Sequence, residues 1–125
     1  MKILFVIPKN KSLFGDDKGM TVHPHVGIAY LSAFLKQNNV GVAIFDEGLE
    51  EDYKKLYSII DDFKPDLIGI TIFSYCYGFA HNLVEKIKER TKIPIVAGGP
   101  HISAVNRKIL EDIKIDFAIK QEREF

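Results

Sequence analysis

The sequence contains a single cysteine, Cys76, and no tryptophan. One thiol excludes a disulfide within the chain, and it excludes an iron–sulfur cluster held by this chain alone, because such clusters are bound by several thiolates. A lone cysteine also favours a reducing compartment, so we expect a cytoplasmic protein. We interpret Cys76 as a buried, inert thiol.

An excess of charge of either sign is also missing. Seventeen basic residues balance seventeen acidic ones, so no overall field attracts nucleic acid or an anionic membrane. No apolar run approaches the ~20 residues that would cross a bilayer. The apolar run after Lys2 is too short for a signal peptide, and Pro8 ends it. We therefore expect neither nucleic acid nor a membrane among the partners.

Several familiar sequence motifs for phosphate or nucleotide binding are absent. No G-x-G-x-x-G follows the first apolar run, and no G-x-x-x-x-G-K-[ST] occurs anywhere. The acid pair of a phosphate-accepting receiver domain is replaced by Pro8-Lys9, which is also a poor flavodoxin phosphate loop. A G-x-S-x-G nucleophile elbow is missing as well. A flavin- or nucleotide-binding domain stays open as an alternative, but without its usual phosphate loop.

The hydrophobic pattern predicts alternating strands and helices. Short apolar runs predict buried strands, and apolar residues at helical spacing predict the helices between them. The first helix should pack through Ile28, Leu31, Ser32 and Leu35, and acids at 50–52 favour the start of the second. We expect strands near residues 2–7, 40–45, 66–73, 93–97 and 116–119, and helices near 24–35, 50–63, 79–90 and 103–110.

This alternation predicts one α/β domain over residues 1–125. The fold is flavodoxin-like or Rossmann-like: a doubly wound, five-stranded parallel sheet in the order 2-1-3-4-5. The chain stops six residues after Ile119, where such folds carry a closing helix. We therefore expect the closing helix to be truncated and the chain to be a fragment of a longer protein. The sheet face left uncovered would favour self-association.

The fourth strand ends in an unusual stretch, Gly98-Gly99-Pro100-His101. Two glycines remove every side chain at the point where the strand leaves the sheet. This pattern is typical of a tight turn, but it also lets a bulky group approach the backbone. Ligands of open α/β sheets bind outside the carboxyl ends of the strands, so the stretch is a candidate binding element.

Three motifs in order resemble one family. They are Pro24-x-x-Gly27-Ile28-Ala29-Tyr30-Leu31, Lys64-Pro65-Asp66-Leu67-Ile68-Gly69-Ile70 and Gly98-Gly99-Pro100-His101. Together they resemble the N-terminal cobalamin-binding domain of cobalamin-dependent radical SAM enzymes, a group that includes the anaerobic magnesium-protoporphyrin IX monomethyl ester cyclase. The resemblance implies a cobalamin cofactor here, and a downstream barrel of the same chain that binds S-adenosylmethionine and an iron–sulfur cluster. The parent would be an enzyme of the cyclase or methyltransferase type.

The resemblance also implies where the cofactor lies. The corrin would cover the carboxyl edge of the sheet, and the nucleotide tail would descend beside the central strands. Thr71 and Ser74 would bond the tail, and Gly98 and Gly99 would let it pass. The corrin would have an aromatic platform made by Phe73, Tyr75 and Tyr77, although packing in the core explains Phe73 equally well. The full set of implied cofactor-binding residues is Gly27, Thr71, Ser74, Tyr75, Gly98, Gly99, Pro100 and His101.

Two features depart from cobalamin-binding relatives. The D-x-H-x-x-G motif, whose histidine ligates cobalt in mutases and methionine synthase, is absent, and Gln121 stands where relatives commonly have glycine. His23, His25 and His101 form only a weak metal-site pattern, so we expect no metal ligand and no catalytic residue in this chain. A degenerate interaction module that binds no ligand stays open as a second alternative.

Overall fold

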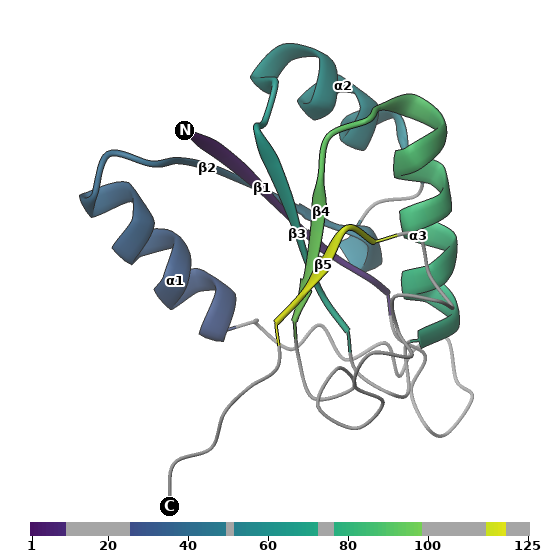
Figure 1. The fold of residues 1–125 in the computed structure, drawn as a ribbon, viewed down its shortest axis with the longest axis horizontal. Helices are drawn as coiled ribbons and strands as arrows, with labels where there is room; N and C mark the ends of the chain where they lie inside the picture. The colour runs from purple at the N-terminus through teal and green to yellow at the C-terminus, as the bar shows by residue number, and fades with distance from the viewer. Residues whose placement is uncertain (10–25, 50–51, 73–76, 99–114, 120–125) are drawn as a thin grey trace, which may run out of the picture.

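The computed structural model describes residues 1–9, 26–49, 52–72, 77–98 and 115–119. Five parallel strands form one sheet in the order β2-β1-β3-β4-β5, which confirms the predicted fold class and strand order (Figure 1). The strands are β1 (Lys2–Ile7), β2 (Gly41–Asp46), β3 (Leu67–Thr71), β4 (Ile95–Gly98) and β5 (Phe117–Ala118). The helices are α1 (Val26–Gln37), the short 3-10 helix η2 (Glu47–Leu49), α2 (Lys54–Phe63) and α3 (Tyr77–Arg90).

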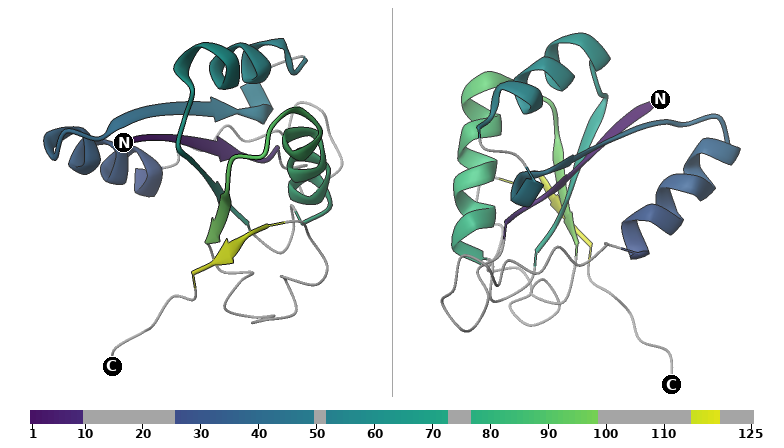
Figure 2. Two further views of the ribbon diagram at one scale, coloured as in Figure 1. Left: turned by 45° about the horizontal axis from the view of Figure 1, so that its top comes forward. Right: turned by 180° about the vertical axis from the view of Figure 1, so that it is seen from behind.

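The main hydrophobic core lies between the sheet and two helices. In Figures 1 and 2, α2 and α3 lie on one side of the sheet and α1 lies on the other. The helical spacing predicted for α3 is confirmed, because its inward residues are fully buried. Every second residue of the central strands points into this core. The core contains Leu4, Val6, Phe45, Leu56, Ile60, Ile68, Ile70, Ala80, Leu83, Val84, Ile87, Ile95 and Ala97.

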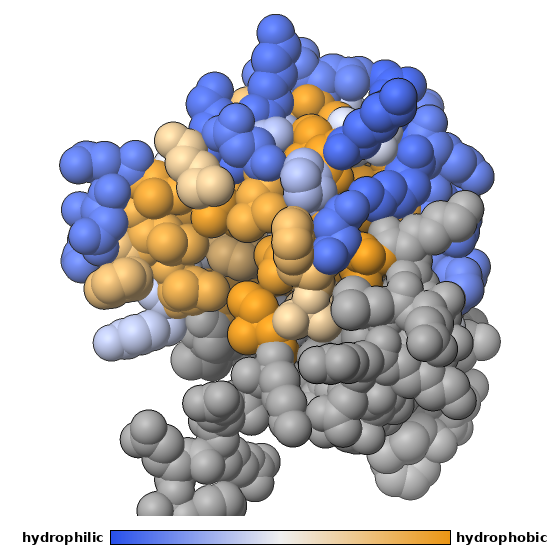
Figure 3. Space-filling model, viewed as in Figure 1, coloured by the Kyte–Doolittle hydropathy of each residue, from blue (hydrophilic) through white to orange (hydrophobic). Residues whose placement is uncertain are grey.

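The opposite sheet face is less completely covered. Phe5, Gly69, Val96 and Phe117 lie side by side in register across four strands of this face. Phe117 is 60% exposed, and Figure 3 shows apolar surface extending from α1 towards β5. Leu31 was predicted to pack inward but is 43% exposed, because the sheet alone does not cover it. Self-association through this face stays a prediction.

The structure corrects several predicted boundaries. The second helix begins at Lys54 and not at residue 50, and it ends before Lys64, whose positive φ of 52° closes the last turn. Gly98 is the last residue of β4 and does not belong to the turn after it. The fifth strand is shortened to two residues. The predicted helix at 103–110 lies outside the described residues. Among the helices that the structure describes, none is long and apolar enough to cross a bilayer.

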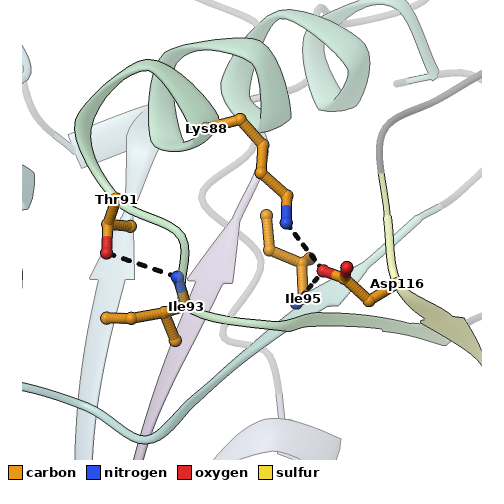
Figure 4. Close-up of polar contacts among 5 residues, drawn as sticks. All are labelled: Lys88, Thr91, Ile93, Ile95 and Asp116. Atoms are coloured by element: carbon orange, nitrogen blue, oxygen red, sulfur yellow. Dashed lines mark hydrogen bonds and ion pairs between the residues drawn. The ribbon is translucent and has the colours of Figure 1, made fainter.

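The edge strand β5 is tied to the sheet by one carboxylate. Oδ2 of Asp116 accepts a hydrogen bond from the Ile95 backbone N–H at 2.9 Å and forms an ion pair with Nζ of Lys88 in α3 at 2.7 Å (Figure 4). The Lys88 hydrogen bond, followed by the Ile95 one, lowers the pKa of Asp116 below its ordinary value. A strand this short depends on such contacts, since its ladder contributes few hydrogen bonds of its own.

Candidate functional site

Two of the predicted site residues meet at the carboxyl edge of the sheet. Thr71 ends β3 and Gly98 ends β4, and the two are partners in the parallel register. The backbone N–H of Ile72 donates to the Gly98 carbonyl oxygen at 2.8 Å, so the pair is fixed by the sheet itself. Thr71 is half-buried. The structure thus places a hydroxyl beside a residue that lacks a side chain, at the edge where α/β folds bind their ligands.

Gly98 has no close neighbour on its α1 side among the described residues. A Cβ added there would meet none of their atoms within 4 Å. The contrast is Gly69 on the same sheet face, where an added Cβ would lie 2.9 Å from Cδ1 of Phe5. By strand alternation, Gly98 and Thr71 both face the side of the sheet that carries α1. Gly69 is thus packed against a ring, whereas a binding role for Gly98 stays a prediction.

The helix α1 borders the same side of the sheet. Gly27 lies in its first turn, and this end of the helix is the one nearest the carboxyl edge (Figure 1). Further along the helix, Ser32 is 5% exposed, and its Oγ has no hydrogen-bond partner among the described residues. A buried hydroxyl without a partner is unfavourable by about 1–3 kcal/mol. The cost would be removed by any polar group that came within reach.

The remaining predicted binding residues cannot be placed. Ser74, Tyr75, Gly99, Pro100 and His101 lie outside the described residues. Their roles stay predictions.

The weak histidine pattern in the sequence led us to expect no metal ligand in this chain. His23 and His25, like His101, are outside the described residues. Within the described ranges, no group of three or more metal-ligating side chains gathers. His81 of α3 is partly exposed, and its Nε2 lies 3.5 Å from Oε1 of Glu85, one turn along the helix.

A buried carboxylate near the same edge was not predicted. Glu47 follows β2 and is only 5% exposed. Its Oε1 accepts the backbone N–H of Lys9 at 3.0 Å, and its Oε2 accepts the Tyr53 hydroxyl at 2.6 Å. Burial, strengthened by the hydrogen bond to Glu47, raises the pKa of Tyr53 far above its usual value, so the hydroxyl stays a donor. In the sequence, an acid after a strand is the only signal of this cluster.

Glu47 and Tyr53 line a hollow of about 420 Å³. It lies on the side of the sheet covered by α2 and α3, opposite to the side that Gly98 faces. Its lining comes from the end of β1, from η2, from the residue before α2, and from α3. The lining residues are Lys9, Glu47, Tyr53, Phe79, Asn82, Glu85, Lys86 and Glu89.

Comparison with a solved structure defines the class of protein. The receiver domain of the TMAO respiratory system response regulator TorR superposes with a TM-score of 0.58 over 97% of this chain and 85% of that domain. The two sequences are 16% identical, so the likeness shows the fold alone. The chain is therefore an α/β protein of the flavodoxin-like class, with Thr71 and Gly98 at the carboxyl edge of its sheet.

The family follows from the sequence comparisons. Residues 18–124 match the B12 binding domain, and the chain belongs to that family. It is also 31% identical, over 128 aligned positions, to a protein of Pyrococcus horikoshii described as an uncharacterized methyltransferase. That alignment takes in 99% of this chain and 27% of the relative. The chain thus spans about a quarter of the relative's length.

Proposed function

We propose that this domain binds cobalamin, with the corrin over the carboxyl edge of the sheet and the nucleotide tail on the side that carries α1. The observation that carries this proposal is Gly98, which lies beside Thr71 in register and where an added Cβ would meet no described atom within 4 Å. Membership of the B12 binding domain family supplies the ligand. The tail needs a path past the ends of β3 and β4, and a Cβ at Gly98 would narrow that path.

The residues present fit such a ligand. A bulky amphipathic molecule needs apolar walls with a few polar groups that fix its orientation. The α1 side of the sheet offers apolar surface around Val96 and Phe117, a hydroxyl at Thr71, and the unpartnered Oγ of Ser32. Ser74, Tyr75, Gly99, Pro100 and His101 would complete the edge by the family resemblance.

The direct test is retention of corrin by purified protein. Protein mixed with hydroxocobalamin should keep the corrin absorbance after desalting, and Gly98→Val should weaken retention by at least about tenfold, equivalent to about 1.4 kcal/mol. Gly98→Ala should have a smaller effect, because it fills less of the path. Gly41→Ala, in the first residue of β2 and so at the opposite end of the sheet, is the matched control. Its Cβ would lie 3.3 Å from Cγ of the flexible Lys2 side chain and 3.7 Å from the Phe63 ring, which is ordinary contact.

Folding must be measured beside binding. Valine suits a strand, and an added Cβ at Gly98 would meet no described atom within 4 Å, so we expect the free energy of unfolding to change by less than about 0.5 kcal/mol. Full retention by folded Gly98→Val protein would exclude the proposed path of the tail. If the unmodified chain retained no corrin, the degenerate interaction module would be the better hypothesis.

For the parent protein, we propose a radical SAM enzyme of the methyltransferase or cyclase type. In it, this domain would hold cobalamin, and a downstream barrel would bind S-adenosylmethionine and an iron–sulfur cluster. Support comes from the motif resemblance and from a relative that is described as a methyltransferase and is about four times longer. The coding sequence beyond Phe125 tests the proposal: it should contain a C-x-x-x-C-x-x-C motif, and its absence would reject the radical SAM assignment.

A further inference from the structure

The hollow between η2 and α3 contains two lysines whose ammonium groups contact aromatic rings. The Lys86 ammonium lies 4.5 Å from the centre of the Tyr53 ring, and the Lys9 ammonium lies 5.4 Å from the centre of the Phe79 ring. Both side chains are half-buried. Within the part of the chain that the structure describes, neither ammonium has a carboxylate at ion-pair distance. Each ammonium has three N–H donors, and those that do not point at the ring are available to another group.

The acidic residues of the hollow differ in what they can still bind. Glu47 already accepts two hydrogen bonds, from the Lys9 backbone N–H and from the Tyr53 hydroxyl. Glu85 is engaged with His81 at 3.5 Å. Glu89 is exposed and lines the hollow one turn from Lys86 along α3. The hollow therefore offers donors from two lysines and from Asn82, and Glu89 is its most exposed acidic acceptor beside Lys86.

We propose that this hollow is a second small-molecule site, which takes a ligand with an oxyanion group, carboxylate or phosphate, and a neighbouring amino group. The oxyanion lies between Lys9 and Lys86, where charge-assisted hydrogen bonds are strongest. The amino group faces Glu89. A volume of about 420 Å³ suits a molecule of amino-acid to nucleotide size. The site is separate from the one at Gly98, because it opens on the other side of the sheet.

The test is a titration followed by ¹H–¹⁵N NMR shifts at constant ionic strength, since screening changes every surface charge. The probes are inorganic phosphate, succinate and L-aspartate, and the last two differ by a single amino group. We expect saturable shifts at the amides of Lys9, Glu47, Asn82 and Lys86, with dissociation constants of roughly 1 mM. Aspartate should bind more tightly than succinate. Comparing the dissociation constants of phosphate and succinate identifies which oxyanion the lysines favour.

Three variants make the test decisive. Lys86→Met keeps an apolar stem over Tyr53 and removes the charge, so it should weaken all three probes by about tenfold. Glu89→Gln should abolish the advantage of aspartate over succinate. Lys36→Met, an exposed lysine in the last turn of α1, is the matched control and should leave the dissociation constants unchanged.

Failure of this site and failure of cobalamin binding give different results. The Lys86→Met protein should still retain corrin after desalting, and the Gly98→Val protein should still bind the anionic probes. The second site is rejected if none of the probes gives saturable shifts up to about 50 mM, well above the expected dissociation constant. It is also rejected if Lys36→Met weakens the probes as much as Lys86→Met does, because the lysines would then act only through net charge.

Discussion

At the scale of single residues, the glycines of the sheet have different tasks. Gly69 lies under the ring of Phe5, its neighbour in register, and an added Cβ at Gly98 would meet no described atom within 4 Å. The sequence predicts a binding role for Gly98, because it lies where a strand ends, but it does not show what Gly69 contacts. The position of the neighbouring Phe5 ring identifies Gly69 as a packing residue.

Gly69→Ala should therefore destabilise the fold. Its Cβ would come within 2.9 Å of Cδ1 and 3.0 Å of Cε1 of Phe5, so the ring must move. Overpacking of this kind costs about 1–3 kcal/mol. Chemical denaturation should show a lower midpoint with an unchanged slope.

Gly78→Ala is the control for this experiment. Gly78 lies in the first turn of α3, and an added Cβ would meet no atom within 4 Å among the described residues. This change should be neutral or stabilise by up to about 1 kcal/mol, because it lowers the entropy of the unfolded chain. If Gly69→Ala were as stable as Gly78→Ala, Phe5 would have to be free to leave its place over β3.

At the scale of elements, strands and helices differ in how far the sequence predicts them. The buried runs of β1, β3 and β4 were predicted because apolar residues continue on both faces. The start of α2 was missed, because acids at 50–52 suggest a helix start, whereas the helix begins at Lys54 after a 3-10 turn. The Glu47–Tyr53 contact depends on that turn. No periodicity in the sequence encodes it.

The attachment of β5 makes a pH-dependent prediction. Lys88 and the Ile95 N–H hold the folded-state pKa of Asp116 below its ordinary value near 3.8. A carboxyl with a lowered folded pKa contributes stability that is present above the unfolded pKa and is lost as pH falls through the folded one. Asp116→Asn should thus lower the free energy of unfolding at neutral pH, and this difference should shrink as pH falls below 3.8 and through the lowered folded-state pKa.

The size of this effect is limited by exposure. The Asp116 side chain is 41% exposed, so the charge contributes at most about 1 kcal/mol at neutral pH. Asp62→Asn is the control, since that exposed carboxylate accepts a hydrogen bond from Ser58 rather than from a cation. Urea unfolding at neutral and acidic pH measures both. A cost of Asp116→Asn that stayed constant with pH would show that the carboxylate charge is not what anchors β5.

At the scale of the whole molecule, the two sides of the sheet differ in task. The side with α2 and α3 holds the main core and the lysine-lined hollow, and the α1 side carries Gly98, Thr71 and exposed apolar surface. The fold class and strand order follow from the sequence, because βα alternation leaves few arrangements. The sequence does not predict which face carries the core hollow and which carries the candidate binding residues, because this depends on which residues become neighbours across strands.

Ligand binding on the α1 side should therefore stabilise the domain as a unit. Cobalamin that binds only the folded state adds about 2.7 kcal/mol at a hundred times its dissociation constant. For a domain of this size that corresponds to a rise in Tm of roughly 10 °C. Differential scanning calorimetry should show the rise with hydroxocobalamin and little with Gly98→Val protein. FMN and NAD should give none, because the chain lacks the phosphate loops that hold them. An equal rise with FMN would favour the flavin-binding alternative, since a tail path at Gly98 gives that cofactor no phosphate site.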